Sequence, residues 1–297
     1  MRNKKVGKQR EDTEVKFTKM HGCGNDYIYV YTGDQDIAPE ERGTLSRKFS
    51  DRHKGIGGDG IIYINPTDEA DFEMEMYNAD GSKGAMCGNG IRCVGKFVYD
   101  HGLTDKKSLK ILTGAGIKTL ELKISEGKAV GATVNMGKPI LEAGKIPVKI
   151  KGYESTDQVI GAPLEVSGEE YRITCVSMGN PHCVIFTDKD LKTLELEKTG
   201  PLFEKHPAFP DRVNTEFIRL KNRTEMDMRV WERGSGETMA CGTGACASLA
   251  AGVLNGICDR RAKVNLIGGE LEIEWSEEDG CIYMTGPAET VFEGVVE

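Results

Sequence analysis

The sequence has no long apolar run and no excess of positive charge, and each absence excludes a class of protein. A membrane-spanning helix needs about 18 consecutive apolar residues, but the longest stretch of small and apolar side chains, at 245–254, is interrupted by Ser248 and Gly252. Lysine and arginine total 39 against 47 aspartates and glutamates, a net charge of −8. That balance does not favour binding to nucleic acid or to an anionic membrane surface. We therefore expect a globular protein with neither of these partners.

No targeting segment is expected either. Residues 1–14 contain five basic and three acidic side chains but only two apolar ones, which fits neither a signal peptide nor a transit peptide. We interpret this stretch as a mobile N-terminal tail. The nine cysteines are an odd number, so at least one is unpaired within the chain. Free thiols and a cytoplasmic location are expected.

Glycine is abundant, at 37 of 297 residues, and it marks where helices begin. Alternating apolar and polar residues predict short strands in both halves of the chain, with a helix at 40–52. Two further helices are predicted at 87–100 and 241–254, and each begins at a glycine-rich turn that carries a cysteine. The helix at 241–254 is apolar on nearly every side, so it belongs inside a core.

An internal repeat connects these two helices. Residues 76–90 align with residues 230–244, so that Cys87 corresponds to Cys241, 154 residues further on. Another pair of residues, Asn25 and Asn180, each follows a glycine after a strand and is separated by 155 residues. Two local matches at nearly the same offset indicate an internal duplication.

The duplication predicts the domain organisation and the fold class. We predict an α/β (α+β) fold with two pseudo-symmetric domains, each a curved sheet or partial barrel around a central helix. The N-terminal half is expected to comprise residues 15–132 plus 284–297, because the last strand is expected to return to it, and the C-terminal half residues 133–283.

The repeated Cys-Gly-x-Gly unit has a chemistry of its own. A cysteine at a helix N-terminus lies at the positive end of the macrodipole, which favours the thiolate. The glycines leave backbone N–H groups uncovered, so each helix start can bind an anion. Two such sites facing each other would hold one carboxylate between two thiols, and one thiol would have to be ionised while the other stays protonated. This arrangement suits stereoinversion at the carbon next to that carboxylate, with Cys87 and Cys241 as the acid and base.

The residues around both cysteines resemble the diaminopimelate epimerase family. The resemblance covers nearly all of residues 15–297 and rests on several blocks, at 20–26, 78–82, 87–93, 177–183, 212–216 and 232–244. It implies a cofactor-independent homodimeric epimerase that interconverts L,L- and meso-diaminopimelate by 1,1-proton transfer, in lysine and peptidoglycan precursor biosynthesis. It further implies that Cys87 deprotonates the L,L isomer and Cys241 the meso isomer, without a metal or cofactor.

The resemblance also implies the residues that hold the small-molecule amino-acid substrate. The backbone amides expected to bind the reacting carboxylate are those of Gly88, Asn89, Gly242 and Thr243. The side chains expected to bind its other polar groups are Asn25, Asn78, Asn180, Asn214, Glu232 and Arg233. His182 and Glu232 are the residues expected to tune the thiol pKa values. The sequence departs from some family members at Gly60, where they have a glutamine, so that contact is absent or replaced.

Other interpretations of the same motifs are weaker. Residues 55–60 match G-x-G-x-x-G, but a helix is predicted before them and a strand after them, the reverse of a dinucleotide-binding fingerprint. The Cys87/Cys93 and Cys241/Cys246 spacings do not match a zinc site, and no lysine lies in a recognisable pyridoxal-phosphate context. Two alternatives stay open: a proline or hydroxyproline racemase-like enzyme, and a thiol redox protein that cycles through a Cys87–Cys241 disulfide.

Overall fold

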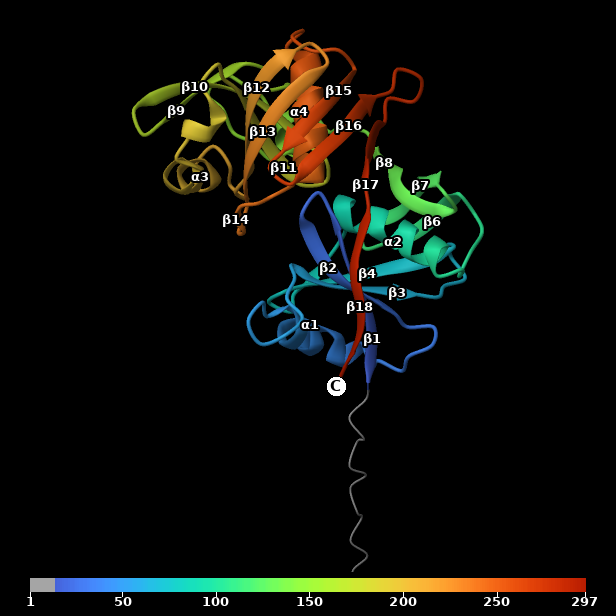
Figure 1. The fold of residues 1–297 in the computed structure, drawn as a ribbon. Coiled ribbons are helices and arrows are strands. Elements are labelled where there is room, and N and C mark those ends of the chain that lie inside the picture. The colour runs from blue at the N-terminus through green and yellow to red at the C-terminus, as the bar shows by residue number, and fades with distance from the viewer. Residues whose placement is uncertain (1–13) are drawn as a thin grey trace, which may run out of the picture.

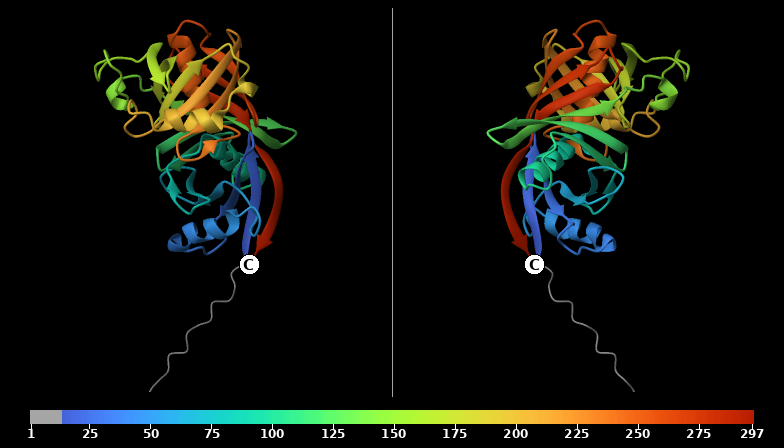
Figure 2. Two further views of the ribbon diagram at one scale, coloured as in Figure 1. Left: turned by 90° about the vertical axis from the view of Figure 1, so that its left-hand side faces the viewer. Right: turned by 90° about the vertical axis from the view of Figure 1, so that its right-hand side faces the viewer.

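The structure is a computed structural model that describes residues 14–297, in which strands form a continuous 18-stranded sheet through two lobes (Figure 1). The predicted tail at 1–14 lies outside the described residues, except for Glu14. The two lobes remain distinct when the molecule is turned to either side (Figure 2). Of the helices in the described residues, none is both long and apolar enough to cross a membrane.

The first lobe contains the strands from the N-terminal part of the chain and the last strand. Its strands are β1 (Val15–Gly22), β2 (Asn25–Tyr31), β3 (Gly60–Asn65), β4 (Phe72–Asn78), β5 (Lys83–Gly84), β6 (Ser108–Thr113), β7 (Gly116–Ser125), β8 (Lys128–Gly137) and β18 (Glu289–Val296). Its helices are the 3-10 turn η1 (Pro39–Glu41), α1 (Arg42–Ser50) and α2 (Gly88–Asp100).

The second lobe repeats this order of elements. Its strands are β9 (Ala162–Val166), β10 (Glu169–Ser177), β11 (Pro181–Phe186), β12 (Asn214–Asn222), β13 (Glu225–Glu232), β14 (Gly236–Glu237), β15 (Arg261–Leu266), β16 (Gly269–Trp275) and β17 (Ile282–Pro287). Its helices are α3 (Leu196–Glu204), α4 (Gly242–Leu254) and the 3-10 turns η2 (Ala143–Lys145) and η3 (Leu191–Thr193).

Strand pairing follows the same pattern in both lobes. β1–β2 and β10–β11 are antiparallel, whereas β2–β3 and β11–β12 are parallel. The crossover that contains α2 joins the parallel strands β4 and β6, and the one that contains α4 joins the parallel strands β13 and β15. This equivalence confirms the predicted fold class of two pseudo-symmetric halves.

The two lobes exchange strands at their junction. After β8 the chain crosses to the second lobe, where β9 pairs with β10, and after β17 it returns, so that β18 pairs with β1. β8 and β17 pair with each other, with Thr133 opposite Thr285. The proposed domain boundaries at 132/133 and 283/284 fall within these two paired strands, and we retain them as a proposal.

The helices α2 and α4 lie inside the curved sheets because most of the side chains that they bury are apolar. In α2, Ile91, Val94 and Val98 are fully buried, and α4 buries nearly all of its length, including Leu249. Both helices belong to one hydrophobic cluster that spans the two lobes. The helix starts therefore meet near the junction of the halves, where the predicted chemistry lies.

Candidate active site

Each of the two central helices begins directly after a predicted catalytic cysteine. Cys87 and Cys241 are the N-cap residues of α2 and α4, with extended backbone conformations. The Cys87 Sγ accepts the backbone N–H of Gly90 at 3.2 Å, and the Cys241 Sγ accepts that of Gly244 at 3.3 Å. A side-chain acceptor at the N-cap satisfies an N–H group that the helix leaves free.

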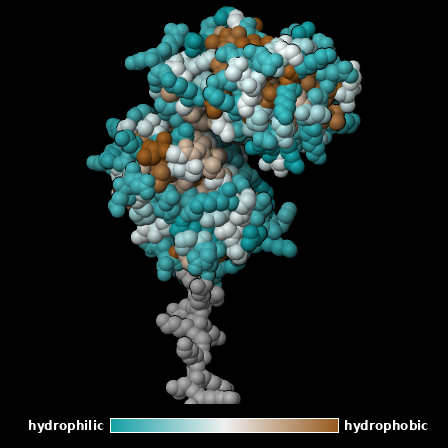
Figure 3. All heavy atoms as spheres, turned by 180° about the vertical axis from the view of Figure 1, so that it is seen from behind, coloured by the Kyte–Doolittle hydropathy of each residue, from teal (hydrophilic) through white to brown (hydrophobic). Residues whose placement is uncertain are grey.

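The two helix starts contact each other and face one cleft. Asn89 at the start of α2 donates from Nδ2 to the carbonyl oxygen of Ala240, the residue before Cys241, at 3.3 Å. Both cysteines line a cleft of about 790 Å³. The molecular surface narrows between the two lobes (Figure 3).

Most of the predicted site residues line this cleft: Asn25, Asn78, Cys87, Gly88, Asn89, Asn180, Glu232, Cys241, Gly242 and Thr243. Three others do not form its lining. His182 is fully buried behind Asn180, and Asn214 is buried, with its Oδ1 accepting the backbone N–H of Arg233 at 2.9 Å. The Arg233 side chain is directed to the Asp211 carbonyl oxygen, at 2.8 Å.

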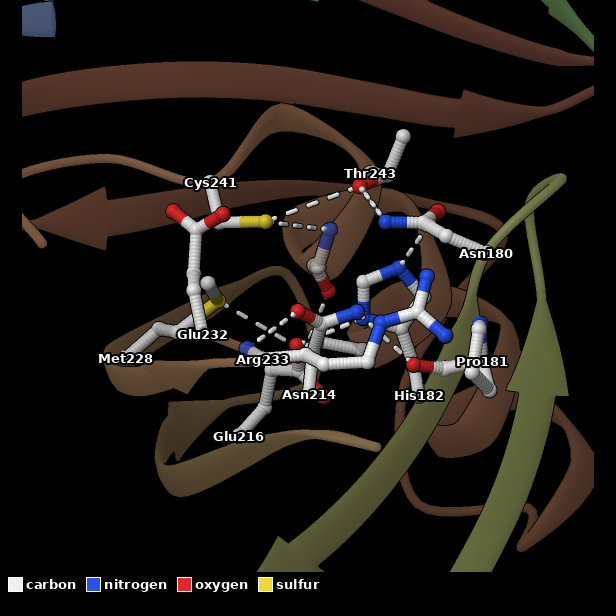
Figure 4. Close-up of polar contacts among 12 residues, drawn as sticks. Asn180, Pro181, His182, Asn214, Glu216, Met228, Glu232, Arg233, Cys241 and Thr243 are labelled. Atoms are coloured by element: carbon white, nitrogen blue, oxygen red, sulfur yellow. Dashed lines mark hydrogen bonds and ion pairs between the residues drawn. The ribbon is translucent and has the colours of Figure 1, made fainter. Parts of the chain in front are cut away.

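A chain of hydrogen bonds connects a buried carboxylate to Cys241 (Figure 4). Glu216 Oε1 lies 2.7 Å from His182 Nδ1, and His182 Nε2 lies 3.0 Å from Asn180 Oδ1. Asn180 Nδ2 donates to Thr243 Oγ1 at 3.2 Å, and that hydroxyl lies 3.5 Å from Cys241 Sγ. Because the Thr243 oxygen accepts from Asn180, its proton is free to be donated to the sulfur.

In the first half, a carboxylate orients the asparagine that is equivalent to Asn180. Asn25 donates from Nδ2 to Asp59 Oδ2 at 2.7 Å, and its Oδ1 accepts the Cys87 thiol proton at 3.1 Å. Asp59 also pairs with Arg52, at 2.9 Å. Both Asp59 and Arg52 line the cleft.

The structure reverses the expected direction of the thiol pKa shifts. Burial raises the pKa of Cys87, although the N–H groups of Gly90 and Asn89 and the guanidinium of Arg92 oppose this effect. Burial raises the pKa of Cys241 well above its ordinary value, and the carboxylates of Glu232 and Glu216 add to the increase. The helix ends do favour the thiolates, but the loss of hydration between two halves outweighs them.

Sequence reasoning did not identify Arg52, Asp59, Tyr27 and Glu216 as parts of the site. Glu216 lies in one of the family-like blocks. A carboxylate on a strand that is otherwise buried was the feature of the sequence that could have indicated its part in the site. Tyr27 corresponds to His182 in the repeat, at the offset of 155 residues.

The ring of Tyr27 lies against Gly60, where an added Cβ would be 2.9 Å from Tyr27 Cε1 and 2.0 Å from the Tyr77 carbonyl oxygen. No side chain fits at position 60, so the glutamine contact of some family members has no counterpart there.

Two solved structures share this fold with the chain. A hydroxyproline epimerase from Agrobacterium vitis matches with a TM-score of 0.71 at 15% identity, covering 97% of this chain and 94% of that one. A PhzF-family phenazine biosynthesis protein from Bacillus anthracis matches with a TM-score of 0.68 at 18% identity, covering 96% and 99%. The chain therefore has the two-domain fold that these proteins share.

Sequence comparison then defines the family. The family model of diaminopimelate epimerase matches residues 17–142 and 174–291. The diaminopimelate epimerase of Agathobacter rectalis is 54% identical over 286 residues, and that of Acetivibrio thermocellus is 52% identical over 285 residues; each match covers 95% of this chain and 99% of the relative. The chain belongs to the diaminopimelate epimerase family and is an epimerase.

The position of Glu232 generates a prediction about Cys241. Glu232 is a cleft carboxylate whose charge raises the pKa of the Cys241 thiol. Replacing it by glutamine removes this charge, so the pKa falls and more thiolate is present at mildly alkaline pH. We expect Glu232→Gln to accelerate alkylation of Cys241 by about three- to tenfold, measured by mass spectrometry of the Cys241 peptide.

Glu237→Gln provides the matched control. Glu237 lines the same cleft but is paired with Arg229 at 2.6 Å, so alkylation of Cys241 should be nearly unaffected. Equal rates in wild type and Glu232→Gln would contradict the electrostatic role of Glu232.

Proposed function

We propose that the protein interconverts L,L- and meso-diaminopimelate by 1,1-proton transfer between Cys87 and Cys241. The observation that carries this proposal is that both cysteines are N-caps of equivalent helices and line one cleft. The conversion supplies meso-diaminopimelate for lysine and peptidoglycan precursor synthesis, an assignment that follows from the family.

In the proposed reaction, one proton is removed from the α-carbon of the substrate and another is delivered to its opposite face. The thiolate of one cysteine takes the α-proton, so that a C–H bond breaks, an S–H bond forms and the electron pair moves onto the adjacent carboxylate. The thiol of the other cysteine then gives its proton to the opposite face of the carbon and becomes the thiolate. The backbone N–H groups of Gly88, Asn89, Gly242 and Thr243 are proposed to stabilise the charge on the carboxylate.

The polar groups of the cleft support a substrate with two amino-acid ends. Diaminopimelate carries two ammonium and two carboxylate groups, which amide oxygens, amide N–H groups, carboxylates and a guanidinium can match. The cleft offers these groups in Asn25, Asn78, Asn180, Glu232 and Arg52. We retain Asn214 and Arg233 as proposed binding residues and His182 and Glu232 as proposed tuning residues.

Two alternatives have less support. The proline or hydroxyproline racemase-like alternative has fold similarity at 15% identity, whereas relatives above 50% identity are named diaminopimelate epimerase. A thiol redox sensor requires accessible thiols with low pKa values. Cys241 is only 5% exposed, which disfavours that role.

Serine variants test the two-base proposal. A hydroxyl is a much weaker acid than a thiol, so Cys87→Ser and Cys241→Ser should each reduce interconversion of the isomers by about 10²–10⁴-fold. Each variant should retain proton exchange with solvent on the face of the substrate served by the remaining cysteine. Chromatographic separation of the stereoisomers measures the first quantity, and deuterium incorporation measures the second.

Cys93→Ala is the control for these variants. Cys93 is fully buried in the hydrophobic cluster, so its removal should leave turnover almost intact. If Cys93→Ala folds but is inactive, or if either serine variant remains fully active, the two cysteines have been assigned wrongly.

We also propose a cytoplasmic homodimer, and β18 provides a surface for the second copy. β18 pairs with β1 along one edge, and Val291, Phe292 and Val295 are 54%, 46% and 57% exposed. Exposed apolar side chains on an unpaired strand edge favour association. Val295→Lys should shift the protein toward the monomer in sedimentation velocity, whereas Val130→Lys, at a site 49% exposed on β8, should not. A wild-type monomer would contradict the proposal.

A further inference from the structure

We propose that Asp59 is a positioning residue for Cys87, because its carboxylate fixes which end of the Asn25 amide faces the sulfur. In that orientation, Asn25 offers Cys87 a hydrogen-bond acceptor and not a donor. The role of Asp59 rests on the function proposed above, since it concerns how one of the two cysteines is prepared to exchange a proton.

A short chain of hydrogen bonds connects Asp59 to Cys87. Asn25 donates from Nδ2 to Asp59 Oδ2 at 2.7 Å, and Cys87 Sγ donates to Asn25 Oδ1 at 3.1 Å. The same sulfur accepts the backbone N–H of Gly90 at 3.2 Å. A thiol has one proton to donate and a sulfur that accepts weakly. These two contacts therefore satisfy the thiol form of Cys87.

Both oxygens of Asp59 accept from nitrogen donors, which is the arrangement that an ionised carboxylate requires. Oδ2 accepts from Asn25 Nδ2 at 2.7 Å and from the backbone N–H of Asp26 at 3.1 Å, and Oδ1 accepts from Arg52 Nη2 at 2.9 Å. Burial and the charge of Asp26 raise the pKa of Asp59, and the same three donors oppose this rise. An ionised carboxylate has no proton to donate. The NH₂ end of the Asn25 amide must therefore face it.

The backbone of Asp59 is held on both sides, so the carboxylate has a fixed origin. Its N–H donates to the Asp26 carbonyl oxygen at 2.7 Å, and its own carbonyl oxygen accepts the N–H of Ala79 at 2.9 Å. Asp59 directly precedes β3 and Ala79 directly follows β4, and these two strands pair with each other. A group supported in this way can orient the side chain that it contacts.

Two other polar neighbours of the Asn25 amide do not select its orientation. The Tyr27 hydroxyl interacts with it, but a phenol hydroxyl can donate as well as accept. The Cys87 thiol can also do either, although weakly. Of these three neighbours, Asp59 alone is limited to accepting, so it determines the orientation.

The second half of the molecule has a different residue at the position of Asp59. The parallel pairs β2–β3 and β11–β12 have equivalent registers, so that Asp59 corresponds to Val213 at the offset of 154 residues. Val213 is apolar and fully buried. Asn180 contacts His182 and Thr243 instead, and Cys241 meets its asparagine through the Thr243 hydroxyl. The role that we assign to Asp59 is therefore specific to Cys87.

The acceptor that faces Cys87 affects its strength as a base. A hydrogen bond made by the neutral form of a group favours that form over the charged one. Asn25 Oδ1 thus favours the thiol, and once Cys87 has delivered its proton the resulting thiolate is a stronger base. If the amide turned, its NH₂ end would stabilise the thiolate and weaken it as a base. Asp59 opposes that turn, because turning would place the amide oxygen against the carboxylate.

The S–H stretching band of Cys87 tests the orientation without substrate. The infrared spectrum of reduced Cys87→Ser is subtracted from that of the reduced wild type at mildly acidic pH, where the thiol is protonated. The same subtraction is made in Asp59→Ala and Asp59→Asn backgrounds. A thiol that donates to an oxygen absorbs at lower wavenumber than a free thiol, so Asp59→Ala should shift the band to higher wavenumber. Asp59→Asn keeps a carbonyl oxygen for Asn25 Nδ2 and should leave the band close to its wild-type position.

Turnover then distinguishes positioning through Asn25 from a general structural effect. Asp59→Ala should lower the kcat for interconversion of the isomers by about ten- to hundredfold, whereas Asp59→Asn should stay within about threefold of wild type. In an Asn25→Ala background, Asp59→Ala should cause no further loss, because residues that act through one another have non-additive effects.

The proposal is overturned if the Cys87 band does not move in Asp59→Ala, or if Asp59→Ala lowers kcat by the same factor with and without Asn25. Equal losses in Asp59→Ala and Asp59→Asn would also overturn it, because they would assign the effect to the charge of Asp59. If Asp59→Ala does not fold, Asp59→Val replaces it, with the residue found at the corresponding position of the second half. An unshifted band with epimerisation intact contradicts the role of Asp59 alone. A shifted band in a protein whose wild type does not epimerise diaminopimelate contradicts the proposed function alone.

Discussion

The hydrogen bond between each N-cap cysteine and the third residue of its helix is the interaction on which the site depends. It sets the position of the sulfur, aligns the helix start toward the cleft and leaves the first N–H groups available for an anion. It also requires glycine at the third position, because a Cβ at Gly244 would lie 3.2 Å from Cys241 Sγ and closer still to Glu216. The same geometry at Cys87 gives a cleft with two nearly equivalent faces.

A reaction that inverts a stereocentre needs two similar groups on opposite faces of the carbon, and it needs those two groups to differ in protonation. The duplicated strands, helices and asparagines place two similar groups on opposite sides of a substrate. The buried charges differ: the carboxylates of Glu232 and Glu216 both raise the pKa of Cys241, whereas at Cys87 the guanidinium of Arg92 opposes the carboxylate of Glu232. The halves are connected by the pairing of β8 with β17 and by the return of the chain through β18 to β1.

The repeat and both cysteine-capped helices were predictable because they depend on local patterns, namely glycine spacing and apolar periodicity. The helix α3 was missed because Gly200 and Pro201 interrupt its pattern. The return of the last strand to the first half was expected from the sequence, but the pairings of β18 with β1 and of β9 with β10 were not, since a strand pattern does not specify its partner. The expected pKa shift was wrong in direction because burial of the sulfurs depends on the opposite half of the molecule. The direction of the Arg233 side chain, toward Asp211, likewise depends on a tertiary contact.

The most direct test of the account is proton NMR of L,L-diaminopimelate incubated with the reduced protein in D₂O. Proton transfer between two cysteines whose S–H protons exchange with D₂O between turnovers predicts that the α-proton signal of one centre disappears, the other centre keeps its proton, and meso product accumulates with deuterium at the inverted carbon. An unchanged spectrum would contradict the account. Exchange of proline or hydroxyproline instead of diaminopimelate would contradict the proposed substrate while leaving the cysteine pair as the reacting groups.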